Sequence, residues 1–364
     1  MTIHLTRPDI GDEEVSAAVE VMKGGWLIRG QQCKLLESEF SSYIGSRYAV
    51  ATNGCTMALY LVLLKMNLTR EDEVIVPSFT WSATASVVIQ AGGTPVFADI
   101  DPNTWCLDPE DVKAKLSSKT RLVIPVHYAG RYASGFESFS VPVLYDSAHR
   151  IEEGDFRGRT SCYSFYAVKN MTTVRGGMVA CDSEDEARWY AMACHGGVGR
   201  DTLARYSGGG DDASSFYYEV EVPAWNFDMT DVEAAIGRVQ LRKLSQMNQA
   251  RNRIVAAYND AFGVQQGGNH LYPVLVQDRN AFLLAMKRAG IQCGIHYLPL
   301  HLMKGYARFY REPLPVTERV GAQCVSLPLY SRLTDEEIQY VVSCVKDSGL
   351  LTASRPLVST VGAS

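Results

Sequence analysis

The sequence predicts an α/β protein in which a large domain with a mostly parallel central sheet precedes a smaller C-terminal α+β domain. Between residues 48 and 145, short apolar runs alternate with stretches of helical periodicity. The runs are continuously apolar, as in parallel strands that helices cover on both faces. The length of 364 residues suits about two domains.

The large domain begins with amphipathic helices, which we expect at residues 11–23 and 31–43. Five strands then follow, at residues 48–52, 73–76, 94–100, 121–128 and 141–145. Helices are expected between them at residues 54–65, 81–90 and 109–116, the last with a proline in its first turn. A short strand before Lys169 and another at residues 178–181 complete the sheet, joined through a Gly176-Gly177 turn.

The second half of the chain predicts one long helix, from the N-cap Thr230 to residue 262. A helix at 184–195 and a flexible Gly/Ser-rich loop at 207–215 precede it. We expect domains at residues 1–240 and 241–350. The second would contain strands at 270–276, 292–297 and 324–329 and helices at 281–289 and 334–346. The polar tail, residues 351–364, is expected to be disordered.

The composition excludes several classes of protein. Net charge is -5 and no Lys/Arg run occurs, which argues against nucleic acid as a partner. Nine cysteines without a Cys-x-x-Cys pair argue against a disulfide framework and a zinc ribbon, and for a reducing compartment. Without a signal-peptide h-region or a membrane-length apolar run, the chain is expected to be cytoplasmic.

Ligands of parallel sheets bind beyond the carboxyl ends of the strands, so the residues at these ends are the candidates for a site. One is Lys169, which has apolar residues on both sides. A lysine there is either a surface residue whose stem packs on the protein, or a buried amine. Burial would lower its pKa and make it a nucleophile toward carbonyls.

Four other strand ends carry polar or aromatic candidates, each with a plainer interpretation. Backbone N–H groups around Thr56 suit a phosphate, or simply begin a capped helix. Trp81 can stack on a planar ring or lie in the core, and Asp146 can pair with a protonated ring nitrogen or cap the next segment. His149 can contact the same ligand or pack structurally. A metal site at His127 and His149 lacks an obvious third ligand, so none is predicted.

Together these features match one ligand. Pyridoxal 5′-phosphate (PLP) needs contacts to its phosphate, ring face, ring nitrogen and aldehyde, and Thr56, Trp81, Asp146 and Lys169 offer them in that order.

The chain resembles the PLP-dependent sugar-nucleotide aminotransferases of the DegT/DnrJ/StrS group, which have the fold type I aminotransferase architecture. The resemblance extends from about Ile10 to Ile338. The stretches that carry it are Gly25-Trp-Leu-Ile-Arg-Gly30, Asn53-Gly-Cys-Thr-Met-Ala-Leu59, Asp72-Glu-Val-Ile-Val-Pro-Ser-Phe-Thr-Trp81, Gly93-Thr-Pro-Val-Phe-Ala-Asp99, Pro125-Val-His-Tyr-Ala-Gly130, Asp146-Ser-Ala-His149, Ser164-Phe-Tyr-Ala-Val-Lys-Asn170, Trp225-Asn-Phe-Asp-Met-Thr-Asp231 and His296-Tyr-Leu-Pro-Leu-His301.

The resemblance implies a role for each matched residue. Lys169 would bind the cofactor covalently and move the proton, Asp146 would pair with the ring nitrogen, and Trp81 would stack on the ring. His149 would lie near the ring hydroxyl. The phosphate ligands would be Cys55, Thr56, Ser164 and, from the neighbouring subunit, Asn226, which implies a homodimer. The implied substrate residues are Arg29, His296, Tyr297 and His301. No metal is implied.

The implied reaction is amino transfer from L-glutamate to a nucleotide-linked keto sugar. Related dehydratases carry His at the position of Lys169, so the lysine favours transamination. Alternatives are an aminotransferase of a free keto-cyclitol or other keto carbohydrate, a PLP-dependent sugar dehydratase, and a non-catalytic PLP-binding regulatory protein.

Some residues depart from the family pattern. Val174-Arg-Gly-Gly177 replaces Gly-Glu-Gly-Gly, Cys55 replaces a glycine, and Asp228 replaces an arginine. We therefore expect Arg175 and Asp228 to form a charge-reversed pair. The segment between Gly130 and Asp146 is also short, which predicts that one crossover helix is lost.

Overall fold

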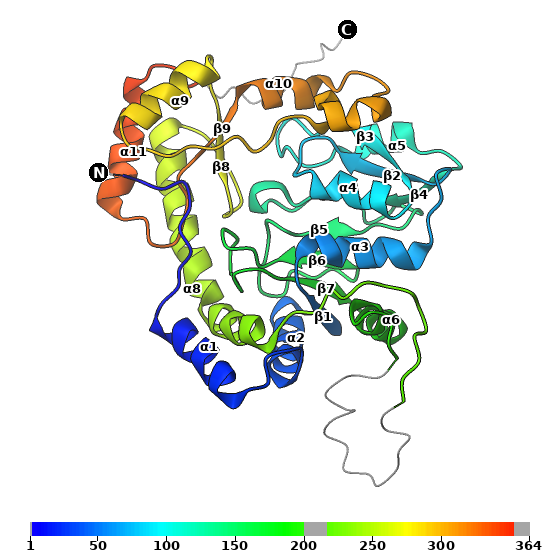
Figure 1. The fold of residues 1–364 in the computed structure, drawn as a ribbon. Helices are drawn as coiled ribbons and strands as arrows, with labels where there is room; N and C mark the ends of the chain where they lie inside the picture. The colour runs from blue at the N-terminus through cyan, green and yellow to red at the C-terminus, as the bar shows by residue number, and fades with distance from the viewer. Residues whose placement is uncertain (1, 200–216, 353–364) are drawn as a thin grey trace.

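The computed structural model describes residues 2–199 and 217–352. Its centre holds two groups of strands (Figure 1). The four-stranded group runs, in order, β1 (Tyr48–Thr52), β7 (Gly177–Cys181), β6 (Ser161–Ser164) and β5 (Tyr145–Asp146). The three-stranded group runs β3 (Thr94–Ala98), β2 (Glu73–Pro77) and β4 (Thr120–Val123). Parallel bridges from Val123 to Val143 and from Val126 to Asp146 join the two groups.

The prediction of a mostly parallel sheet is confirmed. β2 is parallel to both of its neighbours and β5 is parallel to β6, while β7 runs antiparallel to both of its neighbours, β1 and β6. Every residue of β2 and β7 is buried, which explains their continuous apolar runs. β4 and β5 are shorter than expected, because the chain between them pairs only at isolated bridges.

Helices cover both faces of the sheet. The core on one side contains residues of α3 (Cys55–Met66), α4 (Ala83–Gln90) and α6 (Glu184–Cys194). The core on the other side contains residues of α2 (Gln31–Ile44) and of α8 (Asp231–Phe262). α5 (Pro109–Lys115) packs beside β3. Residues 131–144 form no helix or strand, so the expected loss of a crossover helix is confirmed.

The long helix α8 connects the two ends of the molecule (Figure 1). It begins at the predicted cap, where Thr230 and Glu233 exchange hydrogen bonds between side chain and backbone. At one end it packs against α1 (Asp12–Gly24), whose buried Glu14 lies 3.0 Å from the Lys243 amine. Its later residues enter a separate core with the C-terminal elements. The expected division between residues 240 and 241 falls inside this continuous helix, so the two domains stay a prediction.

The C-terminal part contains an antiparallel pair, β8 (Tyr272–Leu275) and β9 (Cys324–Leu327). Three helices lie around this pair: α9 (Arg279–Arg288), α10 (Pro315–Gln323) and α11 (Asp335–Asp347). The predicted strand at 292–297 is wrong, because this segment meets β9 only at a single bridge from Gly294 to Ser326. The N-terminal segment also reaches this part, since the Ile3 N–H donates to the Gly290 carbonyl.

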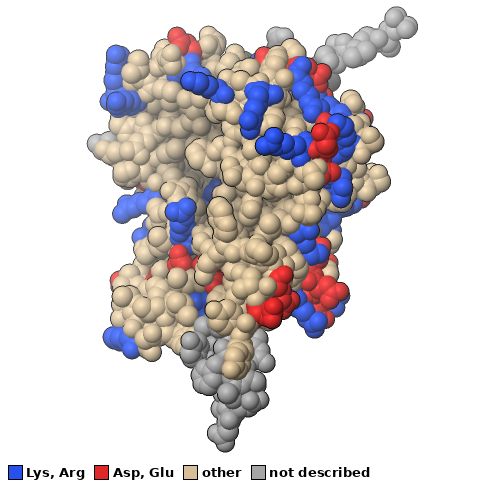
Figure 2. Space-filling model, turned by 45° about the vertical axis from the view of Figure 1, so that its right-hand side comes forward, with Lys and Arg blue, Asp and Glu red and all other residues tan. Residues whose placement is uncertain are grey.

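Some expectations fall outside the described residues. These are the flexible loop at 207–215 and most of the disordered tail, residues 353–364. The first two tail residues are ordered, because Leu351 bridges to Val276 and the Thr352 N–H donates to Leu275. No helix in the described part of the chain has the length and apolar character of a membrane span. On the face in Figure 2, Lys and Arg are dispersed around a largely uncharged centre.

Candidate active site

Lys169 lies in the loop between β6 and β7, beyond the end of the β6 strand. Its side chain is half-buried, and its amine makes no hydrogen bond to another described residue. Burial lowers the pKa of Lys169 to about 8, against opposing effects of Asp146 and Cys55. A large fraction of the amine is therefore neutral and nucleophilic at mildly alkaline pH.

Asp146 is buried at the end of β5, close enough to Lys169 for their charges to interact. Burial raises the pKa of its carboxyl, and three effects oppose that rise. They are a hydrogen bond of 3.1 Å from the Ala148 N–H, one of 2.9 Å from the Thr84 hydroxyl, and the Lys169 charge. Sequence reasoning missed Thr84, although it lies only three residues after Trp81 in the first turn of α4.

The N-terminus of α3 forms a backbone cradle beside these two residues. Neither the Cys55 nor the Thr56 N–H donates to another described residue, as expected for the first turn of a helix. Gly177 lies so close to this turn that a Cβ on Gly177 would be 2.5 Å from the Cys55 nitrogen. A Cβ on Gly54 would meet nothing within 4 Å, so that side of the turn is open. Free N–H groups at a helix N-terminus suit an anion.

Ser164 joins the cradle through strand pairing. It lies opposite Gly177 across β6 and β7, and Gly177 touches the Gly54-Cys55 peptide. Ser164 is buried, and Thr56 is half-buried. The structure thus brings the predicted phosphate ligands of this chain to one place.

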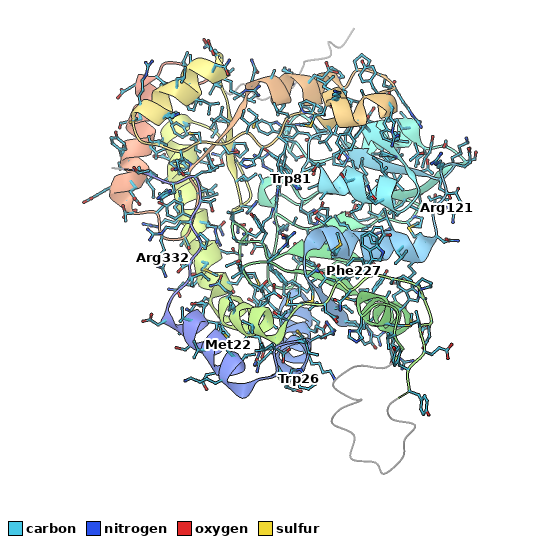
Figure 3. All side chains as sticks on the ribbon, viewed as in Figure 1. Met22, Trp26, Trp81, Arg121, Phe227 and Arg332 are labelled. Carbon is cyan, nitrogen blue, oxygen red and sulfur yellow. The ribbon has the colours of Figure 1, made fainter. Side chains whose placement is uncertain are left out.

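Trp81 provides an open aromatic surface. It is 63% exposed and lies between the α4 end of the sheet and the β8–β9 pair (Figure 3). Its ring centroid is 6.2 Å from that of Tyr297. The exposed indole is therefore available to stack on a planar ring.

His149 and Tyr297 lie together, buried. The Ala129 N–H donates to His149 Nδ1 over 3.3 Å, so the proton of the neutral ring is on Nε2. Nε2 then donates to the Tyr297 oxygen over 2.9 Å, and the two rings stack. Burial, with the Lys169 charge as the next cause, lowers the pKa of His149 well below its usual range.

Two more histidines, His270 and His296, are close enough to Lys169 for its charge to affect them. His270, which sequence reasoning missed, packs against His149 at a tilt, with 4.4 Å between ring centroids. His296 is hydrogen-bonded to Ser326 over 3.0 Å. Burial and the Lys169 charge lower the pKa of His270 well below its usual range and that of His296 to about 4. These rings stay neutral near neutral pH and therefore add no positive charge of their own beside Lys169.

Two predicted substrate residues are placed elsewhere. Arg29 lies in an ion cluster with Glu37 and Asp228, and its guanidinium also donates to the Ala51 carbonyl. His301 is buried, with its ring nitrogens bonded to Ser78 and Glu318. Local polar partners hold both side chains, and their roles toward a substrate stay predictions.

The expected pairing of Arg175 with Asp228 is also wrong. Asp228 contacts Arg29 and accepts a short hydrogen bond from His195, whereas Arg175 is exposed and forms no ion pair with another described residue. Asn226, two residues before Asp228, is exposed beside the exposed Trp225.

His127, the other histidine considered for a metal, packs between the rings of Tyr132 and Tyr145. Its Nδ1 accepts the Ala133 N–H over 3.0 Å, and burial lowers its pKa to about 3. It is a structural histidine. Within residues 2–199 and 217–352, no group of three or more His, Cys, Asp or Glu side chains is placed to hold a metal.

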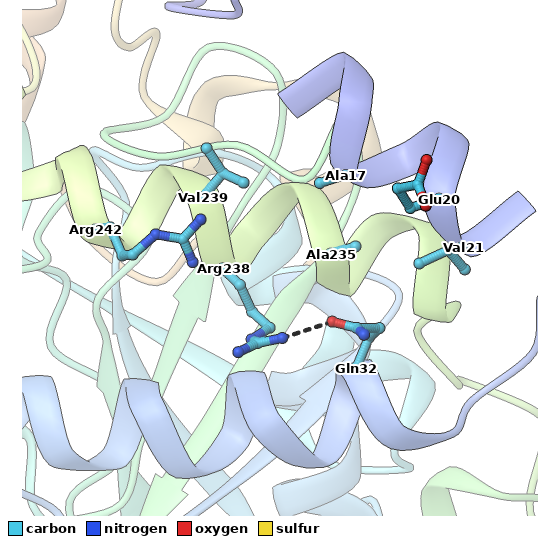
Figure 4. Close-up of a pocket in the computed structure, with 8 residues that line it drawn as sticks. All are labelled: Ala17, Glu20, Val21, Gln32, Ala235, Arg238, Val239 and Arg242. Atoms are coloured by element: carbon cyan, nitrogen blue, oxygen red, sulfur yellow. Dashed lines mark hydrogen bonds between the residues drawn. The ribbon is translucent and has the colours of Figure 1, made fainter. Parts of the chain in front are cut away.

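A separate hollow of about 270 Å³ lies between α1, α2 and α8 (Figure 4). Its Arg238 is engaged by Glu39 and by Gln32. None of its lining residues comes from the strand ends or from the Lys169 loop.

Residues 8–346 match the family model described as the DegT/DnrJ/EryC1/StrS aminotransferase family. The chain belongs to this family. As a member, the enzyme is an aminotransferase and uses PLP, and the resemblance seen in the sequence is confirmed.

Named relatives support this assignment. The aminotransferase is 34% identical to the spore coat polysaccharide biosynthesis protein SpsC of Bacillus subtilis, over 93% of this chain and 95% of that protein. A similar solved structure is the putative sugar aminotransferase Spr1654 of Streptococcus pneumoniae in its PMP form. It has 28% identity and a TM-score of 0.86 over 94% of this chain and 98% of that one. The PLP form of Spr1654 gives a TM-score of 0.84 at 27% identity, over 96% of this chain and 98% of that one.

The residues of the aminotransferase fit this cofactor. The site offers an amine of lowered pKa, a buried carboxylate, open helical N–H groups and an exposed indole. These suit the aldehyde, ring nitrogen, phosphate and ring face of PLP respectively.

Proposed function

We propose that this enzyme transfers the amino group of L-glutamate to a nucleotide-linked keto sugar, and that it works as a homodimer in the cytoplasm. The observation that carries the proposal is the placement of Lys169. Its desolvated amine lies near buried Asp146 and the Cys55–Thr56 cradle, with no hydrogen-bond partner among the described residues.

The site residues receive the following roles in this proposal. Lys169 binds the cofactor aldehyde, and Asp146, held by Thr84 and Ala148, keeps the ring nitrogen protonated. Trp81 stacks on the ring, and His149 and Tyr297 lie at its edge. The Cys55 and Thr56 N–H groups and the Thr56 and Ser164 hydroxyls hold the phosphate.

When bound, PLP carries the amino group and accommodates the electron pair left as the Cα–H bond of the donor breaks. Lys169 takes that proton with its neutral amine and later returns a proton to the acceptor carbon. The Asp146 carboxylate favours electron flow toward the ring by stabilising the charged ring nitrogen. Trp81 shields one face of the ring from water.

Support for a nucleotide-linked acceptor is of two kinds. The similar proteins are named for polysaccharide biosynthesis and as a sugar aminotransferase. In addition, this chain carries an exposed cation, Arg175, two residues before the Gly177 that touches the phosphate cradle. A guanidinium at this position suits the diphosphate of a sugar nucleotide.

Support for the dimer comes from the exposed Asn226 and Trp225, which lie beside the cradle because the Phe227 carbonyl accepts the Asn53 N–H over 2.7 Å. We propose that Asn226 reaches the phosphate of the partner subunit. Support for the cytoplasm comes from the nine cysteines, all of them unpaired and all within the described residues.

The function is tested with purified protein loaded with PLP. The visible band of lysine-bound PLP should be present, should be absent in Lys169→Ala, and should persist in the exposed-site control Lys23→Ala. Glutamate should remove the band, and one member of a panel of keto-sugar nucleotides should restore it. A protein without the band, even with added PLP, would contradict the proposal. Restoration by a free keto-cyclitol alone, or deoxygenation of the sugar without glutamate consumption, would instead establish one of the alternative activities.

Subunit mixing tests the dimer. Lys169→Ala and Asn226→Ala variants are each expected to have low activity, but a mixed dimer contains one site with both residues intact. Activity should therefore rise on mixing. No rise, with subunit exchange verified by mass, would show that Asn226 serves its own chain.

A further inference from the structure

Arg251 of α8 is a buried guanidinium without a carboxylate partner. It is 7% exposed and forms no ion pair with a described Asp or Glu, although the charges of Asp9 and Glu152 are near enough to favour its protonated form. It donates instead to the Asn170 carbonyl over 2.9 Å and to Asn248 Oδ1 over 3.1 Å. Burial lowers the pKa of Arg251 to about 10. Burying an unpaired charge is unfavourable, so its position beneath the residue that follows Lys169 needs an explanation.

Asn170 is held from several directions. Its amide donates to Asn248 Oδ1 over 3.2 Å and to Asn269 Oδ1 over 3.0 Å. Asn248 in turn donates to the Ile151 carbonyl over 2.9 Å, and Asn269 donates to Glu152 over 2.6 Å. The three asparagine side chains are each at most 3% exposed. The Asn170 amide nitrogen and both polar atoms of Asn248 and of Asn269 are thus hydrogen-bonded within the network.

We propose that Arg251 is a positioning residue for Lys169, because it fixes the backbone of Asn170 and thereby the place from which the lysine side chain extends. The network ties the Lys169 loop to α8, to the segment before β8 and to the residues after Asp146. A second contact strengthens the tie to α8, since Gln240 accepts the Thr172 N–H over 3.2 Å. The inference rests on the proposed covalent role of Lys169.

The network also reaches the histidines of the site. Asn269 directly precedes His270, which packs against His149. The Arg251 charge is one of the causes, after burial and the Lys169 charge, that disfavour protonation of His270. Arg251 thus has a geometric and an electrostatic connection to the surroundings of Lys169.

The test compares Arg251→Met and Arg251→Lys with the control Arg253→Met, an exposed arginine two residues on that pairs with Asp335. Three quantities are measured on the PLP-loaded protein: the pH at which its visible absorption band is half-converted (the midpoint), kcat and KM. A further readout is the rate at which PLP-stripped full-length protein regains the band. Arg251→Met should move the midpoint and slow reloading by about 10- to 100-fold, because a displaced reacting group loses rate by factors of this size. The midpoint and reloading rate of Arg251→Lys should lie between those of the wild type and of Arg251→Met, because an ammonium can still donate to the Asn170 carbonyl.

Asn170→Ala provides a second variant, which keeps the Arg251 charge and removes the amide contacts. It should change the midpoint in the same direction as Arg251→Met and lower kcat more than it changes KM. A wild-type midpoint and reloading rate in folded Arg251→Met would overturn the inference, as would a loss of melting temperature alone. If Lys169→Ala keeps its visible band, the proposed function itself fails, and the two failures are thus distinguishable.

Discussion

The Nε2 proton of His149 points at the Tyr297 oxygen, 2.9 Å away, because the Ala129 N–H occupies Nδ1. Both ring nitrogens of His149 are therefore used within the chain. The Tyr297 hydroxyl proton is still available to donate a hydrogen bond to another group. The contact that the family resemblance assigns to His149, near the cofactor's ring hydroxyl, is then available to Tyr297 instead.

Tyr297→Phe should reduce both stability and turnover. The variant leaves the buried Nε2–H of His149 without an acceptor, which costs about 1–3 kcal/mol. Urea unfolding measures the first effect and kcat the second. Tyr310→Phe is the control, because Tyr310 is 45% exposed. Equal unfolding free energies for the two variants would contradict this account of the His149 tautomer.

Lys169→Met should stabilise the protein when PLP has been removed. The pKa of Lys169 falls from 10.5 in the unfolded chain to about 8 in the folded one, so the unfolded state binds more protons between these values. Wild-type stability should rise with pH over that window, and the rise should be absent in the variant. At pH 7 the variant should gain up to about 3 kcal/mol. Lys23→Met, at an exposed position, should leave the pH dependence unchanged.

Acid should destabilise the fold through its buried histidines. His127, His149, His270 and His296 have pKa values lowered by burial, to about 3 for His127 and about 4 for His296. The unfolded state therefore binds more protons from about pH 6.5 downward, and stability falls by about 1.4 kcal/mol per pH unit for each such histidine. Unfolding free energies at pH 7, 6 and 5 measure the slope. His127→Asn should reduce this slope by the contribution of one histidine. An unchanged slope would contradict the lowered pKa of His127.

Gly177→Ala should weaken PLP binding. The new Cβ would lie 2.5 Å from backbone atoms of Gly54 and Cys55, so the first turn of α3 must move. We expect affinity to fall at least about tenfold, or about 1.4 kcal/mol, as measured by titrating stripped protein with PLP. The control is Gly24→Ala, where a Cβ meets nothing within 4 Å. Unaltered affinity in Gly177→Ala would mean that the α3 N-terminus does not hold the phosphate.

The sequence was most informative where the decisive residues are close together along the chain. Thr230 identifies the start of α8, and Asp146 and Lys169 each follow a recognisable strand. The supporting residues were not visible, because their contacts join distant segments: Asn170 meets Asn269, and Thr84 meets Asp146. No local pattern encodes such pairs.

Other contacts were not visible for a related reason. Arg29 and His301 occupy positions that the family resemblance associates with substrate, but a motif does not show that Glu37 or Glu318 will contact the side chain. Likewise, the apolar run at 292–297 resembles a strand, and only the structure shows that it meets its neighbour at one bridge.

The pairing of Ile3 with residues 290–292 and of Leu5 with Leu329 has a consequence for biosynthesis. The ribosome makes Ile3 and Leu5 long before their partners, and β9 is also late. The C-terminal part, which contains β8 and β9, therefore cannot complete its packing until most of the chain has been translated. Until then, Ile3 and Leu5 lack these partners, so the fold is completed only after nearly the whole chain has been synthesised.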